Sequence, residues 1–295
     1  MKIIVLGSNG MLGSKLFEYF TNLPNFDVHG VSKSMPRNGI QKNFTQLDFL
    51  SDKYKEKLRL LENNFQPDVV INSSGMTSLA LCEKDSAIAN FLNGEINAEL
   101  IDVFKNSKFI YISTDSVFSG KKGNFIEEDE THPLNSYANS KVLGERATLT
   151  SGNNSLVLRT NIYGKNEFST DLSLVDWALS MFSNNEDIQG FNDFIFNPLH
   201  LLQVSKAIEC IIKGNDSKTI FHLGCKEHIS KYKFLKILKN FVPESTSKVN
   251  PTKSITPDDG IIRPKITTLN SSKFSDTFNI DFSLKNGINE IFCHN

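Results

Sequence analysis

Short apolar runs alternate with amphipathic segments over the first half of the chain. Several runs are continuously apolar, which is typical of strands buried on both faces of a sheet. The predicted strands are Lys2–Leu6, Asp27–Val31, Asn43–Asp48, Asp68–Asn72, Lys108–Ser113 and Leu156–Thr160. Helical spacing of apolar residues predicts helices over Met11–Phe20, Asp52–Asn64, a stretch that ends near Lys105, and Tyr137–Leu149. This alternation predicts an α/β fold, a doubly wound parallel sheet with helices on both faces.

The alternation loosens after about Gly164. The pattern there predicts helices over Thr170–Phe182, Leu201–Lys213 and Lys231–Phe241, strands over Phe194–Asn197 and Thr219–Leu223, and two short helices near the end. We therefore expect a dinucleotide-binding domain over residues 1–164, completed by parts of 199–225. A smaller, interleaved C-terminal lobe over 165–198 and 226–295 is expected to bind the substrate.

Composition excludes several classes of function. The 295 residues include 32 Lys and Arg against 33 Asp and Glu, a formal net charge of −1. A nucleic-acid or anionic-membrane binder needs a basic excess, so neither partner is expected. The apolar run Ile3–Leu6 breaks at Gly7, which is too short for a signal peptide or a membrane span. The cysteines show no C-x-x-C pair, so we expect free thiols in a cytoplasmic protein and no metal site.

A glycine-rich turn lies between the first predicted strand and the first predicted helix. It reads G-S-N-G-M-L-G, with glycines at positions 7, 10 and 13. Such glycines permit a tight turn, a close backbone approach to a pyrophosphate and close packing of helix on strand. The helix N-terminus then offers free N–H groups and a positive dipole end to the phosphates. The predicted cofactor contacts are Gly7, Ser8, Asn9, Gly10, Met11 and Leu12.

The end of the second strand bears on the type of cofactor. An acidic residue there would hold the ribose hydroxyls of NAD and repel a 2′-phosphate. The chain instead has Ser32 and Lys33, with Arg37 just beyond. These residues favour NADP, with NAD still possible. The alternative is that Lys33 and Arg37 are ordinary solvated loop charges.

A phenol and an ammonium lie four residues apart, at Tyr137 and Lys141, on one face of a predicted helix. Reduction of a carbonyl needs a proton donor beside the hydride acceptor. A nearby Lys cation, together with an oxidised nicotinamide, would lower the pKa of the tyrosine from about 10. Thr114 follows the fifth strand, at the edge of the sheet where ligands bind, and can donate a hydrogen bond to a substrate oxygen. We predict Thr114, Tyr137 and Lys141 as catalytic residues.

The order G-x-x-G-x-x-G, S-T-D, Y-x-x-x-K resembles the extended short-chain dehydrogenases/reductases, and within them the dTDP-4-dehydrorhamnose reductase family. The match runs from Met1 to about Gly164. Its further pieces are Asp68–Gly75, Leu81–Glu83, Ile96-Asn97, Tyr111–Asp115, Val117-Phe118, Gly120, Pro133-Leu134, Lys141–Glu145 and Leu158–Thr160. The resemblance implies an NAD(P)H-dependent oxidoreductase of the Rossmann type. It would reduce the 4-keto group of a nucleoside-diphosphate 6-deoxyhexose in deoxysugar and polysaccharide precursor biosynthesis.

The resemblance also implies further site residues. Its further cofactor contacts would be Asp48, Phe49, Ser73, Ser74, Gly75, Tyr137 and Lys141, the first two beside the adenine and Lys141 on the nicotinamide ribose. Its substrate contacts would be Thr77, Asp115, Ser116, Val117, Asn197 and Arg263. Arg263 is a candidate for the nucleotide diphosphate on its charge alone, and the alternative is a surface arginine.

Two departures from the family fall on substrate contacts. Ser116 stands where the family has Tyr, and Asn192–Pro198 replaces an Asp-Gln…Gly-x-Pro-Thr segment. These departures leave open which sugar and which nucleotide the substrate contains. The chain also has 23 Phe against one Trp, and most of them read as core residues. Phe191, Phe194 and Phe196 lie in or beside the departed segment, and we expect any functional phenylalanine there, shaping a less polar sugar pocket.

Two other functions stay open on the same fold. One is a nucleotide-sugar epimerase, which uses the same Tyr and Lys. The other is a non-catalytic NADP-binding subunit, because the beta subunit of methionine adenosyltransferase resembles the same reductases. A 4,6-dehydratase is disfavoured, since Ser116 stands where it would need a second carboxylate. A homodimer is possible.

Overall fold

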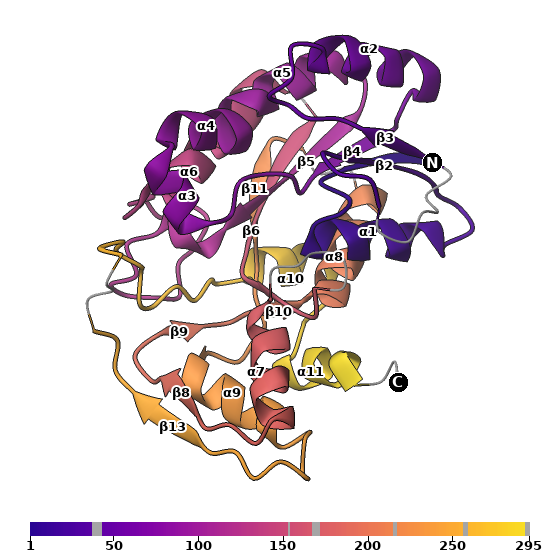
Figure 1. Ribbon diagram of the computed structural model, residues 1–295. Helices are drawn as coiled ribbons and strands as arrows, with labels where there is room; N and C mark the ends of the chain where they lie inside the picture. The colour runs from indigo at the N-terminus through magenta and orange to yellow at the C-terminus, as the bar shows by residue number, and fades with distance from the viewer. Residues whose placement is uncertain (37–42, 153, 167–171, 215–216, 256–258, 293–295) are drawn as a thin grey trace.

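A seven-stranded parallel sheet forms the larger part of the molecule (Figure 1). The computed structural model describes residues 1–36, 43–152, 154–166, 172–214, 217–255 and 259–292. The sheet order is β11-β6-β5-β4-β1-β2-β3, and every neighbouring pair is parallel. The strands are β1 (Lys2–Leu6), β2 (Asp27–Ser32), β3 (Phe44–Gln46), β4 (Val69–Asn72), β5 (Lys108–Thr114), β6 (Ser155–Thr160) and β11 (Thr219–Leu223). The predicted doubly wound α/β fold is confirmed.

Helices cover both faces of the sheet (Figure 1). On one face lie α1 (Met11–Thr21) and α8 (Leu201–Lys213), and on the other α2 (Tyr54–Phe65), α5 (Ile96–Val103) and α6 (Ser136–Ser151). Successive β1 residues point to opposite faces: Ile3 and Val5 join the α1/α8 core, and Ile4 and Leu6 join the other. Burial on both faces explains why β1 is continuously apolar.

The stretch predicted as one helix ending near Lys105 is divided. It consists of α3 (Leu79–Lys84), α4 (Ser86–Asn90), a π-helical turn η1 (Phe91–Glu95) and α5. Gly94 of η1 and Gly144 of α6 let these segments pack closely, because a Cβ at Gly144 would overlap Asn93 O and the Tyr111 hydroxyl. The π-helical turn therefore sits directly against the helix that carries Tyr137.

Beyond β6 the chain forms short strand pairs apart from the large sheet. The pairs are β7 (Ile162–Tyr163) with β10 (Leu199–His200), β9 (Ile195–Phe196) with β12 (Ile229–Ser230), and β8 (Ile188–Phe191) with β13 (Val249–Thr252). Of these the sequence predicted only β9. The remaining helices are α7 (Leu174–Ser183), α9 (Lys231–Lys239), α10 (Ser272–Phe278) and α11 (Leu284–Phe292). The predicted start of α7 at Thr170 lies outside the described residues.

The strand β11 and helix α8 return to the large sheet, as the sequence suggested. The pair β8/β13 and helix α9 lie at the far end of the molecule from the sheet (Figure 1). Helix α10 packs on β11, although its residues were assigned to the smaller lobe. The division into two lobes stays a prediction. Within the described residues, no helix is both long enough and apolar enough to cross a bilayer.

We expect Gly144→Ala to lower the free energy of unfolding by about 1–3 kcal/mol, because the added methyl forces α6 away from η1 and β5. Urea unfolding followed by circular dichroism measures the change. Asn139→Ala, at an exposed position of the same helix, is the matched control and should stay within about 0.5 kcal/mol of wild type. Equal effects at the two positions would contradict the packing described here.

Candidate active site

Three side chains predicted to be catalytic meet at the carboxyl end of β5. Thr114 is the last residue of β5, and Tyr137 and Lys141 lie on α6. The Thr114 hydroxyl is hydrogen-bonded to the Tyr137 phenol, and Lys141 Nζ donates to Ile112 O at 2.7 Å, two residues before Thr114. The start of α6 is held by Glu83 of α3, whose carboxylate accepts two hydrogen bonds from Ser136, both 2.7 Å.

Tyr137 differs from expectation in its acidity. Burial raises its pKa to about 12, the negative charge of Asp115 adds to this, and the Thr114 hydrogen bond opposes it. Lys141 is not among the groups that shift the pKa of Tyr137 in this state, and its ammonium donates to a backbone carbonyl. At neutral pH Tyr137 is therefore a protonated phenol, the form that can donate a proton.

Lys141 is buried against the sheet. Its ammonium lies 4.2 Å from the centre of the Tyr111 ring, and the side chain is only 6% exposed. Burial lowers the pKa of Lys141 to about 7, and the negative charge of Glu145, one helical turn away, opposes the shift. Small changes around Lys141 can therefore alter its charge in the neutral range.

A buried ion pair lies beneath these residues. Arg159 of β6 and Glu145 of α6 form a bidentate pair, with N–O distances of 2.9 and 2.8 Å, and both side chains are at most 5% exposed. Ser113 Oγ donates to the same carboxylate at 2.6 Å. Arg159 also lies 3.2 Å from His222 Nε2 and over the Phe118 ring. This network connects α6 to three strands of the sheet.

Asp115 follows Thr114 and is also buried, which raises its pKa. Its carboxylate accepts hydrogen bonds from the hydroxyls of Thr114 and Ser116 at 3.1 and 3.3 Å. It also accepts from Asn161 Nδ2 at 2.8 Å and from the hydroxyl of Thr267. Asn161 and Thr267 were not predicted, because only the fold brings these distant positions to the end of β5.

The glycine-rich turn has the geometry of an anion site. Gly7 has φ of +80° and donates to Val31 O at 2.8 Å, and Gly10 precedes α1 without a side-chain cap. Ser8 Oγ and Asn9 Oδ1 are buried and have no partner within the described residues. A Cβ at Gly13 would overlap the carbonyl oxygen of Gly7, so this glycine lets α1 approach the strand. Buried polar atoms without a hydrogen-bond partner, next to the free N–H groups of a helix N-terminus, are suited to binding the phosphates of a dinucleotide.

The two residues that begin α1 after the turn, Met11 and Leu12, differ in burial. Met11 is partly exposed, whereas the Leu12 side chain is buried in the hydrophobic core. Leu12 can therefore contribute only backbone groups to the predicted cofactor site.

The loop after β4 closes the other side of the turn. Ser73 Oγ donates to Leu6 O at 2.7 Å, Ser74 Oγ donates to Asn72 Oδ1 at 2.6 Å, and Gly75 has φ of +154°. Asn93 of η1 binds both backbone groups of Met76. The same amide donates to Ser140 of α6, at 2.9 Å. Asn93 was not predicted, and it links this loop to the helix of Tyr137.

Residues at the end of β2 form an ion pair with those after β3. Lys33 Nζ lies 3.0 Å from Asp48 Oδ2, and the pKa of Asp48 is lowered by the Leu50 N–H and by Lys33. Ser32 is partly exposed, and Phe49 packs edge-on against Tyr54. Arg37 lies outside the described residues. The structure thus brings Lys33 beside Asp48 and Phe49, and their contact with the cofactor stays a prediction.

Two predicted substrate contacts are corrected. Val117 is fully buried in a cluster with Phe118 and Phe125, so its side chain cannot reach a substrate. Asn197 is also buried, and its amide bonds Cys225 O, Leu269 O and Leu269 N at 2.8–3.1 Å. It therefore ties two segments of the fold together, and both of its amide hydrogens are already donated within the protein.

The other predicted substrate contacts keep accessible groups. Thr77 is exposed in the loop before α3, and Ser116 is partly exposed. Arg263 forms a bidentate ion pair with Asp259, at 3.1 and 2.6 Å. A cavity of about 420 Å³ lies beside this pair and beside the start of α6. It is lined by Ala80, Glu83, Leu134, Asp259, Gly260, Ile261 and Ile262.

The three singled-out phenylalanines have different surroundings. Phe196 is 5% exposed and packs on Phe234 in the core, so it does not shape a pocket. Phe191 and Phe194 form a ring pair with centroids 5.4 Å apart, and Phe191 is 39% exposed. Only these two remain candidates for substrate contact.

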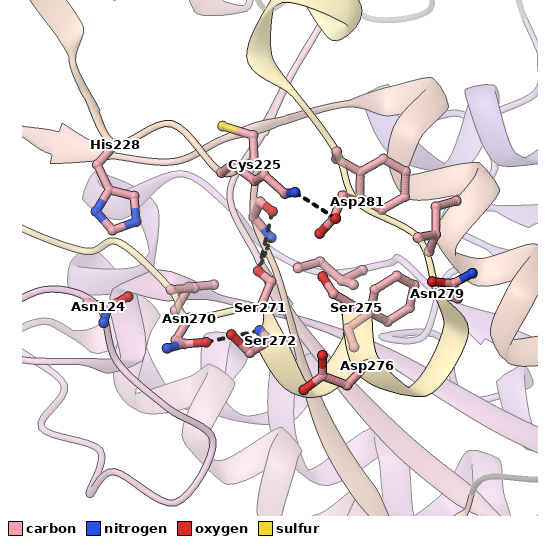
Figure 2. A pocket seen from close by; sticks show the side chains of 17 residues that line it. Asn124, Cys225, His228, Asn270, Ser271, Ser272, Ser275, Asp276, Asn279 and Asp281 are labelled. Atoms are coloured by element: carbon pink, nitrogen blue, oxygen red, sulfur yellow. Dashed lines mark hydrogen bonds and ion pairs between the residues drawn. The ribbon is translucent and has the colours of Figure 1, made fainter.

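A second cavity, of about 580 Å³, lies away from these residues, between the end of β11 and α10 (Figure 2). Figure 2 shows Ser271 bonded to the chain at Gly224, and Cys225, His228 and Asp281 around the opening. None of the predicted site residues lines it. Within the described ranges, no three His, Cys, Asp or Glu side chains gather in a way that could hold a metal ion.

Comparisons with known proteins agree with the fold. Residues 1–293 match the RmlD substrate binding domain. The chain is 29% identical to a dTDP-4-dehydrorhamnose reductase of Aggregatibacter actinomycetemcomitans, over 79% of this chain and 76% of that one. It is 26% identical to the rat methionine adenosyltransferase 2 subunit beta, over 92% and 81%. The crystal structure of a Bacillus anthracis dTDP-4-dehydrorhamnose reductase in complex with NADP superposes with a TM-score of 0.86, at 21% identity, over 100% and 99%.

Because His222 is buried, we expect the stability of the fold to decrease in acid. Burial and the neighbouring Arg159 lower the pKa of His222 to about 3. Unfolded chains bind the proton near the ordinary value of 6.5, so His222 contributes stability above pH 6.5 that is lost as the pH falls toward 3. We expect urea unfolding to show a smaller loss of stability between pH 7 and pH 5 in His222→Gln than in wild type. His132→Gln, at an exposed loop position, should lose as much as wild type; an unchanged pH dependence in His222→Gln would contradict the assignment.

Proposed function

The chain belongs to the RmlD substrate binding domain family, and we propose that it reduces the 4-keto group of a nucleotide-activated 6-deoxyhexose with NADPH. The observation that carries the proposal is the meeting of Thr114, Tyr137 and Lys141 at the end of β5, beside a phosphate-binding turn. Two relatives named above are dTDP-4-dehydrorhamnose reductases, which supports a dTDP-sugar substrate. Such a reaction belongs to deoxysugar and polysaccharide precursor biosynthesis.

The residues of the glycine-rich turn fit NADP. The N–H groups at the start of α1 and the unpartnered Ser8 hydroxyl would bind the pyrophosphate. Lys33 lies at the end of β2, where the 2′-phosphate of the adenosine ribose belongs in this fold. Ser73, Ser74 and Gly75 would border the cofactor from the loop after β4. NADPH supplies a hydride to the carbonyl carbon when it is bound.

Tyr137 is the proposed proton donor. The carbonyl oxygen gains negative charge as the carbon is reduced, and a neutral phenol can donate its proton to it. Thr114 has a hydroxyl bonded to Tyr137 and Asp115, and would turn this hydroxyl toward the same oxygen. Lys141, held between Ile112 O and the Tyr111 ring, would stabilise the tyrosinate that remains and hold the nicotinamide ribose.

A non-catalytic NADP-binding subunit is the alternative, because the rat relative named above is a methionine adenosyltransferase subunit beta. An epimerase would use the same tyrosine and lysine. Consumption of NADPH with a keto-sugar nucleotide separates the reductase from both, since a binding subunit consumes none and an epimerase regenerates its cofactor. A homodimer and a cytoplasmic location stay predictions of the sequence.

We expect Tyr137→Phe to lower kcat for the keto-sugar nucleotide by about 10²–10⁴-fold, because it removes the proton donor and keeps the ring. NADPH oxidation followed by absorbance measures the rate, and NADPH binding followed by fluorescence should be unchanged. Tyr232→Phe, on α9, is the control and should keep wild-type activity. Full activity of Tyr137→Phe would refute the mechanism.

We expect Lys33→Ala to weaken NADPH binding by about 5–10-fold and to leave NADH binding unchanged, since only NADPH carries the 2′-phosphate. Fluorescence titration of both cofactors measures the two dissociation constants. Lys55→Ala removes an exposed, ion-paired lysine from α2 and should change neither. Equal losses for NADPH and NADH in Lys33→Ala would show that Lys33 does not select the phosphate.

A further inference from the structure

Tyr111 is a fully buried aromatic residue beside the proposed catalytic lysine. It lies on β5, three residues before Thr114, in the core between the sheet and the helices α5 and α6. The ammonium of Lys141 stands over its ring, 4.2 Å from the centre. In the sequence Tyr111 belongs to a stretch that resembles the reductases, and no function follows from that position alone.

The Lys141 ammonium carries three N–H donors and a full charge away from water. One donor is bonded to Ile112 O at 2.7 Å. The carboxylate of Glu145 attracts the ammonium from one turn further along α6, but this carboxylate is already in an ion pair with Arg159. The face of an aromatic ring carries negative potential, so the Tyr111 ring adds electrostatic stabilisation to that of a shared carboxylate.

The orientation of the Tyr111 ring is fixed by two neighbouring elements. Its hydroxyl donates to Asn93 O of η1 and is hydrogen-bonded to the side chain of Asn97 on α5. Gly144, one turn after Lys141 on the same face of α6, leaves the space for this hydroxyl, because a Cβ there would lie 2.4 Å from it. The ring is therefore held at both ends, and the contact of its face with Lys141 is built into the packing.

Burial acts against the charge of Lys141. It lowers the pKa of the lysine to about 7, and the charge of Glu145 opposes this shift. Burial also raises the pKa of Tyr111 well above its usual value and that of Tyr137 to about 12, so both phenols are neutral at pH 7. Arg159 of β6 is paired with Glu145. A buried lysine in these surroundings needs a further source of negative potential to stay charged.

We propose that Tyr111 is a positioning residue, whose ring face keeps the Lys141 ammonium charged and fixed beside Tyr137 for the reduction. The inference rests on the proposed function, which assigns to Lys141 the stabilisation of the tyrosinate and the binding of the nicotinamide ribose. A neutral amine has no charge to offset that of the tyrosinate. Tyr111 acts through Lys141. If its ring only filled the core, its replacement would alter stability and leave the chemistry unchanged.

Titration of the lysine side chains by NMR in the ligand-free protein tests the proposal without any reaction. The ¹³Cε signal of Lys141, assigned by its absence in Lys141→Met, reports the charge of the ammonium. We expect its midpoint to fall by about 1–2 pH units in Tyr111→Leu, because a buried cation loses its contact with the ring face. Tyr111→Phe keeps the ring and should keep the wild-type midpoint. Phe109→Leu removes a buried ring from the same strand and cluster, and should also titrate as wild type does.

Oxidation of NADPH with a keto-sugar nucleotide gives the second readout. The reduction needs a charged Lys141, so kcat falls as the pH rises through the pKa of this lysine. In Tyr111→Leu the fall should begin at lower pH, and kcat at pH 8 should drop by about 10-fold or more, with little change in KM. Tyr111→Phe and Phe109→Leu should keep the wild-type profile. If Tyr111→Leu folds poorly, Tyr111→Met fills more of the volume without a ring and should behave alike.

Three results would overturn the proposal: a wild-type midpoint and pH profile in both Tyr111→Leu and Tyr111→Met, an equal displacement in Tyr111→Phe, or an equal displacement in Phe109→Leu. The NMR titration involves neither cofactor nor substrate. A displaced Lys141 titration in a protein that reduces no keto-sugar would refute the proposed function and support the Tyr111 assignment. A reductase whose Tyr111 variants titrate as wild type does would do the reverse.

Discussion

The candidate site depends on one buried ion pair. Arg159 and Glu145 bind each other in a bidentate pair between β6 and α6, and breaking such a pair leaves a buried charge without a partner, which costs about 3–5 kcal/mol. The pair therefore holds α6 at one position against the sheet. Because Tyr137 and Lys141 lie on that helix and Thr114 ends a neighbouring strand, the ion pair sets their mutual geometry although it touches none of the reacting groups.

A second buried carboxylate joins the sheet to the C-terminal part of the chain. Asp115 needs several donors to be stable out of water, and it obtains them from Thr114, Ser116, Asn161 and Thr267. Thr267 is more than a hundred residues away in sequence and its N–H donates to Ile195 of β9, so this bond brings the strand pair β9/β12 to the end of β5. The part of the chain proposed to bind the cofactor and the part proposed to bind the substrate thus meet at Asp115, and both parts donate hydrogen bonds to its carboxylate.

Local patterns predicted the strands of the large sheet and the residues that meet at the end of β5. The glycine turn, the strands and the Tyr137–Lys141 spacing follow from backbone conformation and helical periodicity, which are properties of neighbouring residues. The predictions of substrate contacts failed for side chains that pack in the interior of the protein. Val117 and Asn197 match the family in sequence position, but their neighbours come from distant segments, and these neighbours bury Val117 and occupy the amide of Asn197. Burial raises the pKa of Tyr137, and its lowering beside an oxidised nicotinamide stays a prediction.

The sequence by itself determined the doubly wound sheet and the position of the glycine-rich turn, and it predicted Tyr137 as the proton donor, since each rests on short-range spacing that nearby residues impose. Only the tertiary structure decided which polar groups are free to act. It paired Lys33 with Asp48 and Arg263 with Asp259, and it placed Asn93 between the loop after β4 and α6. Pairing and desolvation depend on contacts between remote segments, and no local pattern in the chain encodes them.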